Sequence, residues 1–212
     1  MFLDIKIPSK LGRISLVPPS EADDPFVAVL RSHIETRRYL RYFPELFSAA
    51  DARDRRIKRE SEPDLIDFHI HLAQNSPAAT GATNTFVGST GIFNIIDTFI
   101  GNSCEVGILI SPDYFRGGLA TEALYTVLKW VFEDRKFHRA EFNTGTDNLA
   151  MRGWLEKAGA TLEGTKRECW VDPSTGGFTD VCTYSILEEE WREIVSGRLE
   201  ERMNRGTLSV AG

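Results

Sequence analysis

Cysteine is scarce in this chain, which has three such residues, Cys104, Cys169 and Cys182, among 212. An odd number without closely spaced pairs is not typical of zinc or redox motifs, so we expect reduced thiols in a cytosolic protein. Long apolar runs are also missing, because no stretch of about 18 apolar residues occurs. The first residues, MFLDIKIPSK, lack a charged head followed by a long apolar segment. From these two absences we expect that the protein is not secreted and has no membrane partner.

Excess positive charge is absent as well. The formal net charge is −6 and the isoelectric point is about 5.3. Proteins that bind nucleic acid through their overall field are usually basic, so we expect no nucleic-acid partner. Hydrophobic residues make up 42% of the chain, which is enough for a sizeable core. Length and composition together predict a single domain over residues 1–212.

The hydrophobic pattern predicts an α+β fold, a mixed and mostly antiparallel sheet flanked by helices. Sparse strands and several helical segments come before Glu60, and apolar residues then alternate with period two from Leu65. Residues 75–84 are small and polar and predict a hairpin loop. The predicted strands cover 13–17, 65–72, 85–93, 104–110, 139–143, 161–170 and 178–187. The predicted helices after residue 118 cover 119–131, 148–158 and a charged C-terminal segment, 188–205.

A possible anion site lies where the strand at 104–110 gives way to the next helix. Gly117 and Gly118 stand at the point where that helix must begin. Four backbone N–H groups in the first turn of a helix have no partner within the helix, and the helix dipole adds positive charge there. Glycines let the backbone approach a phosphate closely, and Arg116 adds a cationic fork. Taken alone, the pair is more typical of a simple glycine turn that joins a strand to a helix.

Two neighbouring segments, EVGILISPDYFRGGLATEAL and DNLAMRGWLEKAGATLEGTKRE, supply further motifs in a fixed order. With them, the chain from about Arg13 to Trp191 resembles the GNAT acetyltransferase superfamily, in particular its ribosomal-protein N-terminal acetyltransferase-like branch. The resemblance implies the GNAT acyl-CoA N-acyltransferase fold, with acetyl-CoA as the acetyl donor. It also implies that the strand at 104–110 splays from the strand at 139–143, and that the pantetheine arm of acetyl-CoA lies in that gap.

The resemblance also implies which residues bind acetyl-CoA. Backbone N–H groups of the loop and helix start hold the diphosphate, and those of the strand at 108–110 polarise the thioester carbonyl. Phe115 departs from the family, which usually has Gln or Arg there, and Arg116 is the candidate replacement. Asn148 is either a cofactor contact or only a helix N-cap. The predicted cofactor-binding residues are Ile108, Leu109, Ile110, Phe115, Arg116, Gly117, Gly118, Leu119, Ala120, Thr121 and Asn148.

Acetyl transfer needs a group that accepts a proton from the amine, since an alkylamine is mostly protonated at neutral pH. The resemblance implies that Glu105 is this general base, acting through water, and a partly desolvated carboxylate suits the task. The alternative is a paired strand carboxylate without a catalytic role. The tyrosine that relatives use to protonate the departing thiolate is missing, and Tyr184 is the candidate substitute.

These residues predict an N-acetyltransferase that acts on a primary amine, either a protein N-terminus or a small molecule. The rival hypothesis is a catalytically inactive acyl-CoA-binding module. Loops at 37–47 and 172–177, with Tyr39, Tyr42 and Phe43, are expected on the acceptor side. The sequence leaves the oligomeric state open.

Three other features are interpreted without assigning a site to them. His69 and His71 share a strand face, but no third ligand is evident nearby, so we expect no metal. Residues 31–60 carry nine Lys or Arg against five Asp or Glu, which we interpret as a solvated helix face. Cys104 has no histidine beside it in the sequence and is interpreted as a core residue.

Overall fold

The computed structural model describes residues 5–73, 76, 85–99 and 101–208. Its centre is an eight-stranded sheet in the order β1-β2-β3-β4-β5-β6-β8-β7. All neighbouring strands are antiparallel except β5 and β6. The strands are β1 (Ile7–Pro8), β2 (Ile14–Val17), β3 (Ile66–Leu72), β4 (Phe86–Thr98), β5 (Gly101–Ile110), β6 (Arg139–Gly145), β7 (Thr161–Asp172) and β8 (Gly177–Leu187).

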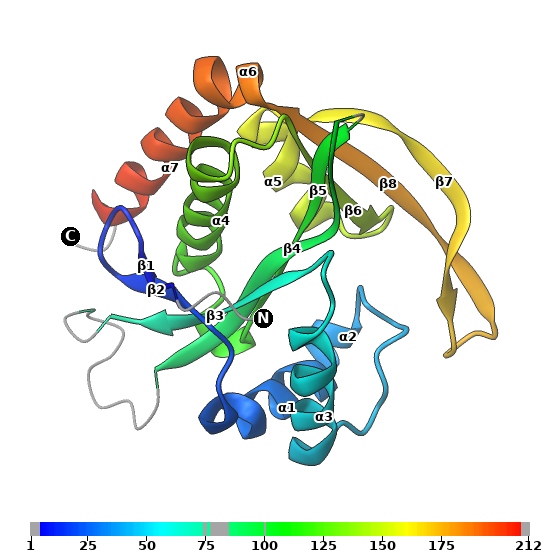
Figure 1. Ribbon diagram of the computed structural model, residues 1–212. Helices are drawn as coiled ribbons and strands as arrows, with labels where there is room; N and C mark the ends of the chain where they lie inside the picture. Colours follow the sequence, from blue (N-terminus) through cyan, green and yellow to red (C-terminus); the bar gives the residue numbers. More distant parts are fainter. Residues whose placement is uncertain (1–4, 74–75, 77–84, 100, 209–212) are drawn as a thin grey trace.

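Helices lie on both faces of this sheet (Figure 1). One group packs into the main core with the central strands: α4 (Leu119–Lys129), α5 (Leu149–Ala158) and α7 (Ser196–Leu208). On the other face, α1 (Asp24–Ser32) and α3 (Ala49–Glu60) build a second, smaller core against β4, and the short α2 (Ile34–Arg37) follows α1. Short helical turns complete the chain at η1 (Glu21–Asp23), η3 (Pro112–Tyr114), η4 (Trp130–Asp134), α6 (Glu188–Glu190) and η5 (Trp191–Val195).

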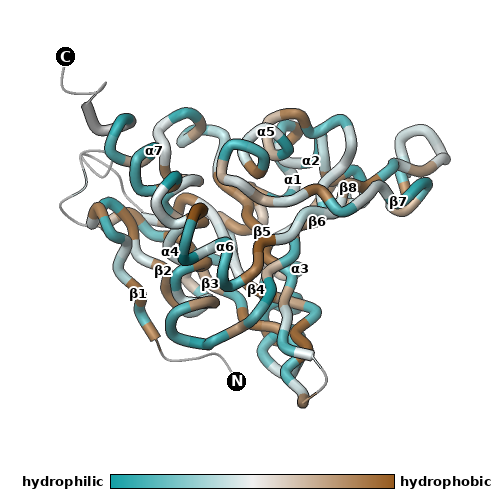
Figure 2. Tube along the Cα trace, turned by 90° about the horizontal axis from the view of Figure 1, so that it is seen from above, coloured by the Kyte–Doolittle hydropathy of each residue, from teal (hydrophilic) through white to brown (hydrophobic). Residues whose placement is uncertain are grey.

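The main core follows from the apolar stripe of α4. Ala123, Leu124, Val127 and Leu128 are at most 1% exposed, as expected for side chains that recur at helical spacing on one face. In Figure 2 hydrophobic segments concentrate in central strands such as β5, whereas much of α7 is hydrophilic. The inward face of α7 still contributes Leu199 to the same core.

The sheet opens between its two parallel strands. β5 pairs with β6 only from Ser103 to Glu105, opposite Arg139 to Glu141. Beyond Glu105, β5 stays paired with β4 as far as Ile110, while β6 stays paired with β8. A strand–helix–strand connection through α4 explains the parallel pairing. The predicted splay of the strands is therefore present.

The sequence predicted this architecture well, with two omissions. The short strand β1 was not predicted, and β4 extends to Thr98 rather than ending near Phe93. Of the loop predicted over 75–84, only Ser76 lies within the described residues. Among the helices that the structure describes, none is long and apolar enough to cross a membrane.

Candidate active site

The loop before α4 has the conformation of an anion-binding nest. Arg116 and Gly118 have positive φ angles of 64° and 77°, and Gly117 between them does not. Such alternation turns successive backbone N–H groups toward one concave side. Gly118 is the N-cap of α4, and no side chain caps this helix. The unpaired N–H groups of its first turn are therefore available to an anion, as predicted.

Arg13 and Glu122 hold this loop in place, and sequence reasoning missed both. Arg13 donates from Nη1 to the carbonyl oxygen of Gly117 (3.0 Å) and from Nε to Oε2 of Glu122 (2.6 Å). The Glu122 side chain is fully buried, and its Oε1 also accepts a hydrogen bond from the Ser9 hydroxyl. The residue before β2 and the first turn of α4 are thus joined by a partly buried ion pair. The partners are separated by 109 residues, so no local pattern indicated the contact.

We expect Glu122→Gln to lower the free energy of unfolding by about 3 kcal/mol, because it leaves the partly buried Arg13 cation without its carboxylate. Urea denaturation measures this change. Glu201→Gln is the matched control, since the Glu201 side chain is 72% exposed and its ion pair with Arg205 contributes little. Equal unfolding free energies for the two variants would contradict the role given to Glu122.

The open edge of β5 offers further backbone donors. The N–H of Ser111 donates to the carbonyl of Val87 in β4 (2.8 Å). Because hydrogen bonding alternates along an antiparallel strand, the N–H of Leu109 also faces β4, whereas those of Ile108 and Ile110 face the gap toward β6. The prediction is therefore refined: two of the three strand residues present N–H groups to the gap, and Leu109 does not.

The helices on either side of the gap are connected. The indole of Trp154 on α5 donates to the Thr121 hydroxyl on α4 (3.1 Å). Asn148 caps α5, since its Oδ1 accepts from the N–H of Met151 (3.2 Å). Of the two roles predicted for Asn148, the structure thus shows the N-cap, which uses the side-chain oxygen. Phe115 is half-exposed and its N–H is taken by the Pro112 carbonyl, so this residue offers no free backbone donor.

Glu105 is the last residue of β5 that pairs with β6, and its side chain lies on the same face of the sheet as that of Leu109. Leu109 packs against the smaller core of α1 and α3, so this is the face away from α4. Burial raises the pKa of Glu105, and hydrogen bonds from Asn143 and Asn94 offset this only in part. The Asn94 amide donates to Oε2 at 2.9 Å from a bulge where its φ is 51°. A carboxylate with a raised pKa is suited to accept a proton.

Cys104 has the opposite orientation. It is 2% exposed within the main core, where burial raises the pKa of its thiol to about 12. The thiol is therefore neutral and unsuited to act as a nucleophile. The prediction of a core cysteine is confirmed.

The Tyr184 hydroxyl is enclosed in the fold and is not accessible as a proton donor to a thiolate. Its side chain is fully buried, and its hydroxyl donates to Glu156 (2.9 Å) and accepts from Arg152 (3.3 Å). It is paired with Phe142, one residue before Asn143, and therefore projects from the sheet face opposite Glu105. Burial raises the pKa of this phenol. These contacts identify a structural link between β8 and α5, so we correct the expected catalytic role.

The loop at 38–48 contacts the β7–β8 hairpin. The ring of Tyr42 meets that of Trp170 edge-on, with centroids 5.5 Å apart. Arg41 donates to the Thr179 hydroxyl (3.0 Å) and pairs with Asp147 and Asp172. The two segments predicted for the acceptor side are therefore in contact. In Figure 1 the hairpin extends from the sheet beyond the helices.

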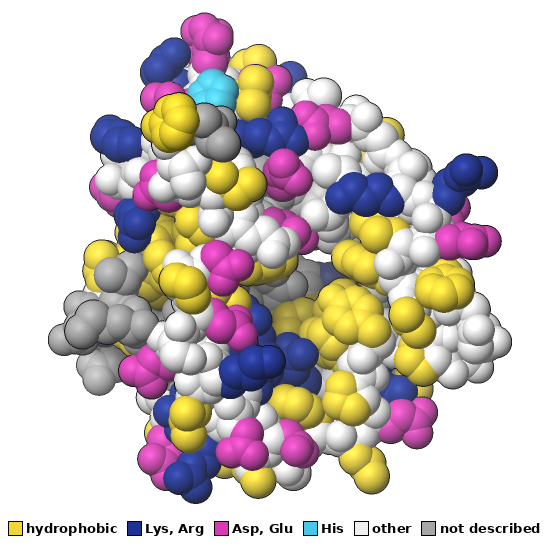
Figure 3. All heavy atoms as spheres, turned by 45° about the vertical axis from the view of Figure 1, so that its right-hand side comes forward, with side chains coloured by type: hydrophobic (Ala, Val, Ile, Leu, Met, Phe, Trp, Pro, Cys, Tyr) yellow, Lys and Arg dark blue, Asp and Glu magenta, His cyan; other side chains and the backbone are white. Residues whose placement is uncertain are grey.

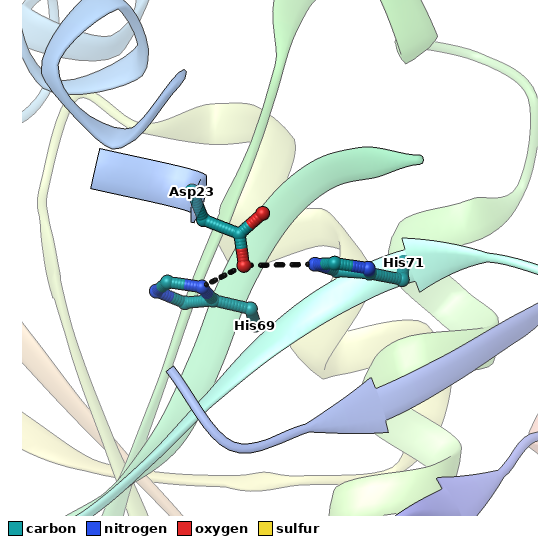
Figure 4. Close-up of side chains that lie close together, drawn as sticks. All are labelled: Asp23, His69 and His71. Carbon is teal, nitrogen blue, oxygen red and sulfur yellow. Dashed lines mark hydrogen bonds and ion pairs between the residues drawn. The ribbon is translucent and has the colours of Figure 1, made fainter. Parts of the chain in front are cut away.

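A separate polar cluster joins η1 to β3 (Figure 4). Asp23 Oδ2 lies 2.7 Å from Nδ1 of His69 and 3.0 Å from Nε2 of His71. The expectation that no third ligand type lies near the two histidines is therefore wrong. Burial alone raises the pKa of Asp23, but the hydrogen bonds and charges of the two histidines hold it well below its usual range. The same oxygen accepts from Ser20, so these groups satisfy one another as a buried hydrogen-bonded cluster.

A parallel strand pair that splays, a nest at the following helix and a carboxylate at the point of splaying together define an acyl-CoA-dependent acyltransferase architecture. Residues 13–161 match the family model of the acetyltransferase (GNAT) domain. The chain belongs to the GNAT acetyltransferase family.

Named relatives agree with this membership. A protein of Bacillus subtilis (strain 168) named as an uncharacterized N-acetyltransferase, YnaD, is 31% identical over 87 residues, which are 41% of this chain and 50% of that protein. The chain spans about half the length of the curated relatives it matches.

Solved structures share the fold. A GNAT-family acetyltransferase from Bacillus anthracis is 24% identical, with a TM-score of 0.69 over 88% of this chain and 100% of that chain. A spermidine N-acetyltransferase from Vibrio cholerae, in complex with CoA and spermine, is 19% identical, with a TM-score of 0.72 over 85% and 99%.

Proposed function

We propose that this protein transfers an acetyl group from acetyl-CoA to a primary amine, with Glu105 as the general base. The observation that carries the proposal is the position of Glu105, a carboxylate of raised pKa at the residue where β5 leaves β6. The family provides the reaction class, and the solved relative in complex with CoA supports the donor. In the net reaction a C–N bond forms, the C–S bond breaks and the amine loses a proton.

The residues of the chain fit acetyl-CoA in three places. The nest of Arg116 to Gly118 and the uncapped start of α4 suit a diphosphate. The gap between β5 and β6 suits an extended pantetheine arm, whose amides pair with strand backbone. The N–H groups of Ile108 and Ile110 suit an oxygen that gains negative charge. Acetyl-CoA supplies the activated acetyl group when bound.

Glu105 acts on the amine acceptor, as the group that accepts its proton. Its carboxylate is oriented by the amides of Asn94 and Asn143, and Asn143 is itself held by the Thr183 hydroxyl at 2.8 Å. An oriented, partly desolvated carboxylate takes a proton from the amine directly or through water. No tyrosine is assigned to the thiolate. A thiol with a pKa near 8.5 leaves readily as thiolate and takes its proton from solvent.

The rival function is an acyl-CoA-binding module without activity, and release of CoA thiol decides between the two. We expect thiol release when acetyl-CoA is mixed with at least one amine from a panel of peptides with varied N-termini and small amines. Tight binding of acetyl-CoA by calorimetry, with no thiol release from any amine in that panel, would instead support the binding module.

A further inference from the structure

Three arginine side chains lie close together on the acceptor side, with few carboxylates to balance them. Arg59 is bidentate to Asp67 on β3 (2.6 and 2.9 Å), and Arg55 lies 3.6 Å from the same carboxylate. Arg31 on α1 forms no ion pair within the described part of the chain, although the charges of Arg55 and Arg59 both act on it. We call Arg31, Arg55 and Arg59 the arginine cluster.

Arg31 is the unusual member of this cluster. Its guanidinium carbon lies 3.8 Å from the centre of the Phe43 ring and 5.2 Å from that of Phe47. Its Nε is buried and has no hydrogen-bond partner among the described residues. Burial, with the like charges of Arg55 and Arg59, lowers the pKa of Arg31 to about 9. Burying a cation with an unpaired N–H costs free energy, which an incoming anion would recover.

Tyr42 connects this cluster to the candidate base. The Tyr42 phenol is near enough to both Arg31 and Glu105 for their charges to shift its pKa in opposite directions, although burial has the largest effect and raises it. The Tyr42 phenol therefore lies within electrostatic range of both the Arg31 cation and the Glu105 carboxylate. In Figure 3, Lys and Arg side chains lie directly beside hydrophobic side chains in the hollowed middle of one face.

We infer that the acceptor is an amine that also carries a carboxylate, and that Arg31, supported by Arg55, binds this carboxylate while the amine approaches Glu105. The inference rests on the proposed function and narrows its substrate class. A guanidinium fork matches a carboxylate with two parallel hydrogen bonds, and its contact with Phe43 fixes the plane of the fork. The carboxylate belongs either to an acidic residue at a peptide N-terminus or to a small amino acid.

Matched acceptor pairs test the inference. Peptides that begin with Asp or Asn differ by one charge, and 4-aminobutyrate and its amide form the small-molecule pair. We expect kcat/KM to be roughly 10- to 100-fold higher for the acidic member of at least one pair, because a hydrogen bond between charged groups is lost in the other. The pair that discriminates identifies the source of the carboxylate. Equal values in both pairs would overturn the inference and leave acetyl transfer intact.

Variants separate charge recognition from folding. Arg31→Gln should bring the acid-to-amide ratio of kcat/KM close to one, because it removes the charge that distinguishes the two members of each pair. Arg55→Gln should reduce the ratio by a smaller factor. Arg53→Gln is the control, because Arg53 lies on the same helix, α3, and is exposed. A misfolded variant loses activity with both members, so the ratio in Arg55→Gln then decides, and an unchanged ratio there would contradict the cluster's role.

A binding measurement does not depend on turnover. In calorimetry with CoA present, the acidic peptide should bind wild type more tightly than its amide partner, and Arg31→Gln should abolish the difference. If no amine releases thiol but this difference is found, the anion site stands and the proposed acetyl transfer fails. If thiol is released without any difference in affinity or rate, the anion site fails alone.

Discussion

Glu105→Gln should lower kcat by roughly 10²- to 10⁴-fold, the usual contribution of a positioned general base. The amide keeps the size of the side chain and a hydrogen-bond acceptor for Asn94, but it cannot take a proton from the amine. Acetyl-CoA affinity should stay within about twofold, because the predicted diphosphate site, Arg116 to Gly118, lies beyond the C-terminal end of β5. Steady-state kinetics and calorimetry measure the two quantities. A kcat within threefold of wild type would remove Glu105 from the mechanism.

The same variant should not lose stability. Burial raises the pKa of Glu105, so the folded state disfavours its charged form relative to the unfolded chain. A raised carboxyl pKa makes folding less favourable at pH values above that pKa, and the penalty disappears as pH falls below the unfolded value. The neutral Gln carries no such penalty at pH 7. A Tm equal to or above that of wild type therefore excludes misfolding as the cause of lost activity.

The pH dependence gives the base a second test. In wild type, kcat/KM should fall as pH drops through the pKa of Glu105, at a pH above the ordinary value of about 4.3. Glu141, the partner of Glu105 across the β5–β6 pairing, contributes to the raised pKa through its charge. Glu141→Gln should therefore keep activity and move the acidic limb to lower pH. An upward shift of that limb would contradict the electrostatic account.

Local patterns were sufficient for those parts of the site that lie on one continuous segment. The alternation of apolar residues and the position of the glycines located β5, Gly118 and the start of α4. Strand and helix periods, and the glycine that a left-handed N-cap requires, depend only on residues that are close together in the sequence. The family resemblance, rather than geometry, indicated Glu105. Its environment of Asn94 and Asn143 depends on a bulge in β4 and on the partner strand, which no local pattern encodes.

Contacts between distant segments were not predictable in the same way. Arg13 reaches Glu122 across 109 residues, and Asp23 reaches His69 across 46. The basic segment at 31–60 shows the same difficulty, since α3 turns Arg53 to solvent but Arg55 inward toward Asp67. Which arginine is buried depends on how α3 packs on the sheet. Tyr184 failed as a candidate for the same reason, because only the register with β6 fixes its face.

Gly118→Glu should abolish measurable acetyl-CoA binding, with Kd raised at least about 100-fold. Two effects act together at this residue. Its φ of 77° strains any residue with a Cβ by roughly 1–3 kcal/mol. A carboxylate at the uncapped start of α4 would also occupy the place of a phosphate and repel it.

Gly118→Asn separates these effects, since Asn tolerates the left-handed region better than other residues and brings no charge. We expect it to weaken binding by about tenfold or less, well short of Gly118→Glu. Ligand-induced stabilisation gives an independent readout, because a ligand at 100 times its Kd stabilises the folded state by about 2.7 kcal/mol. Wild type should show this increase with acetyl-CoA, Gly118→Asn part of it and Gly118→Glu none. If Gly118→Glu bound acetyl-CoA with unchanged affinity, the nest from Arg116 to Gly118 would not be the diphosphate site.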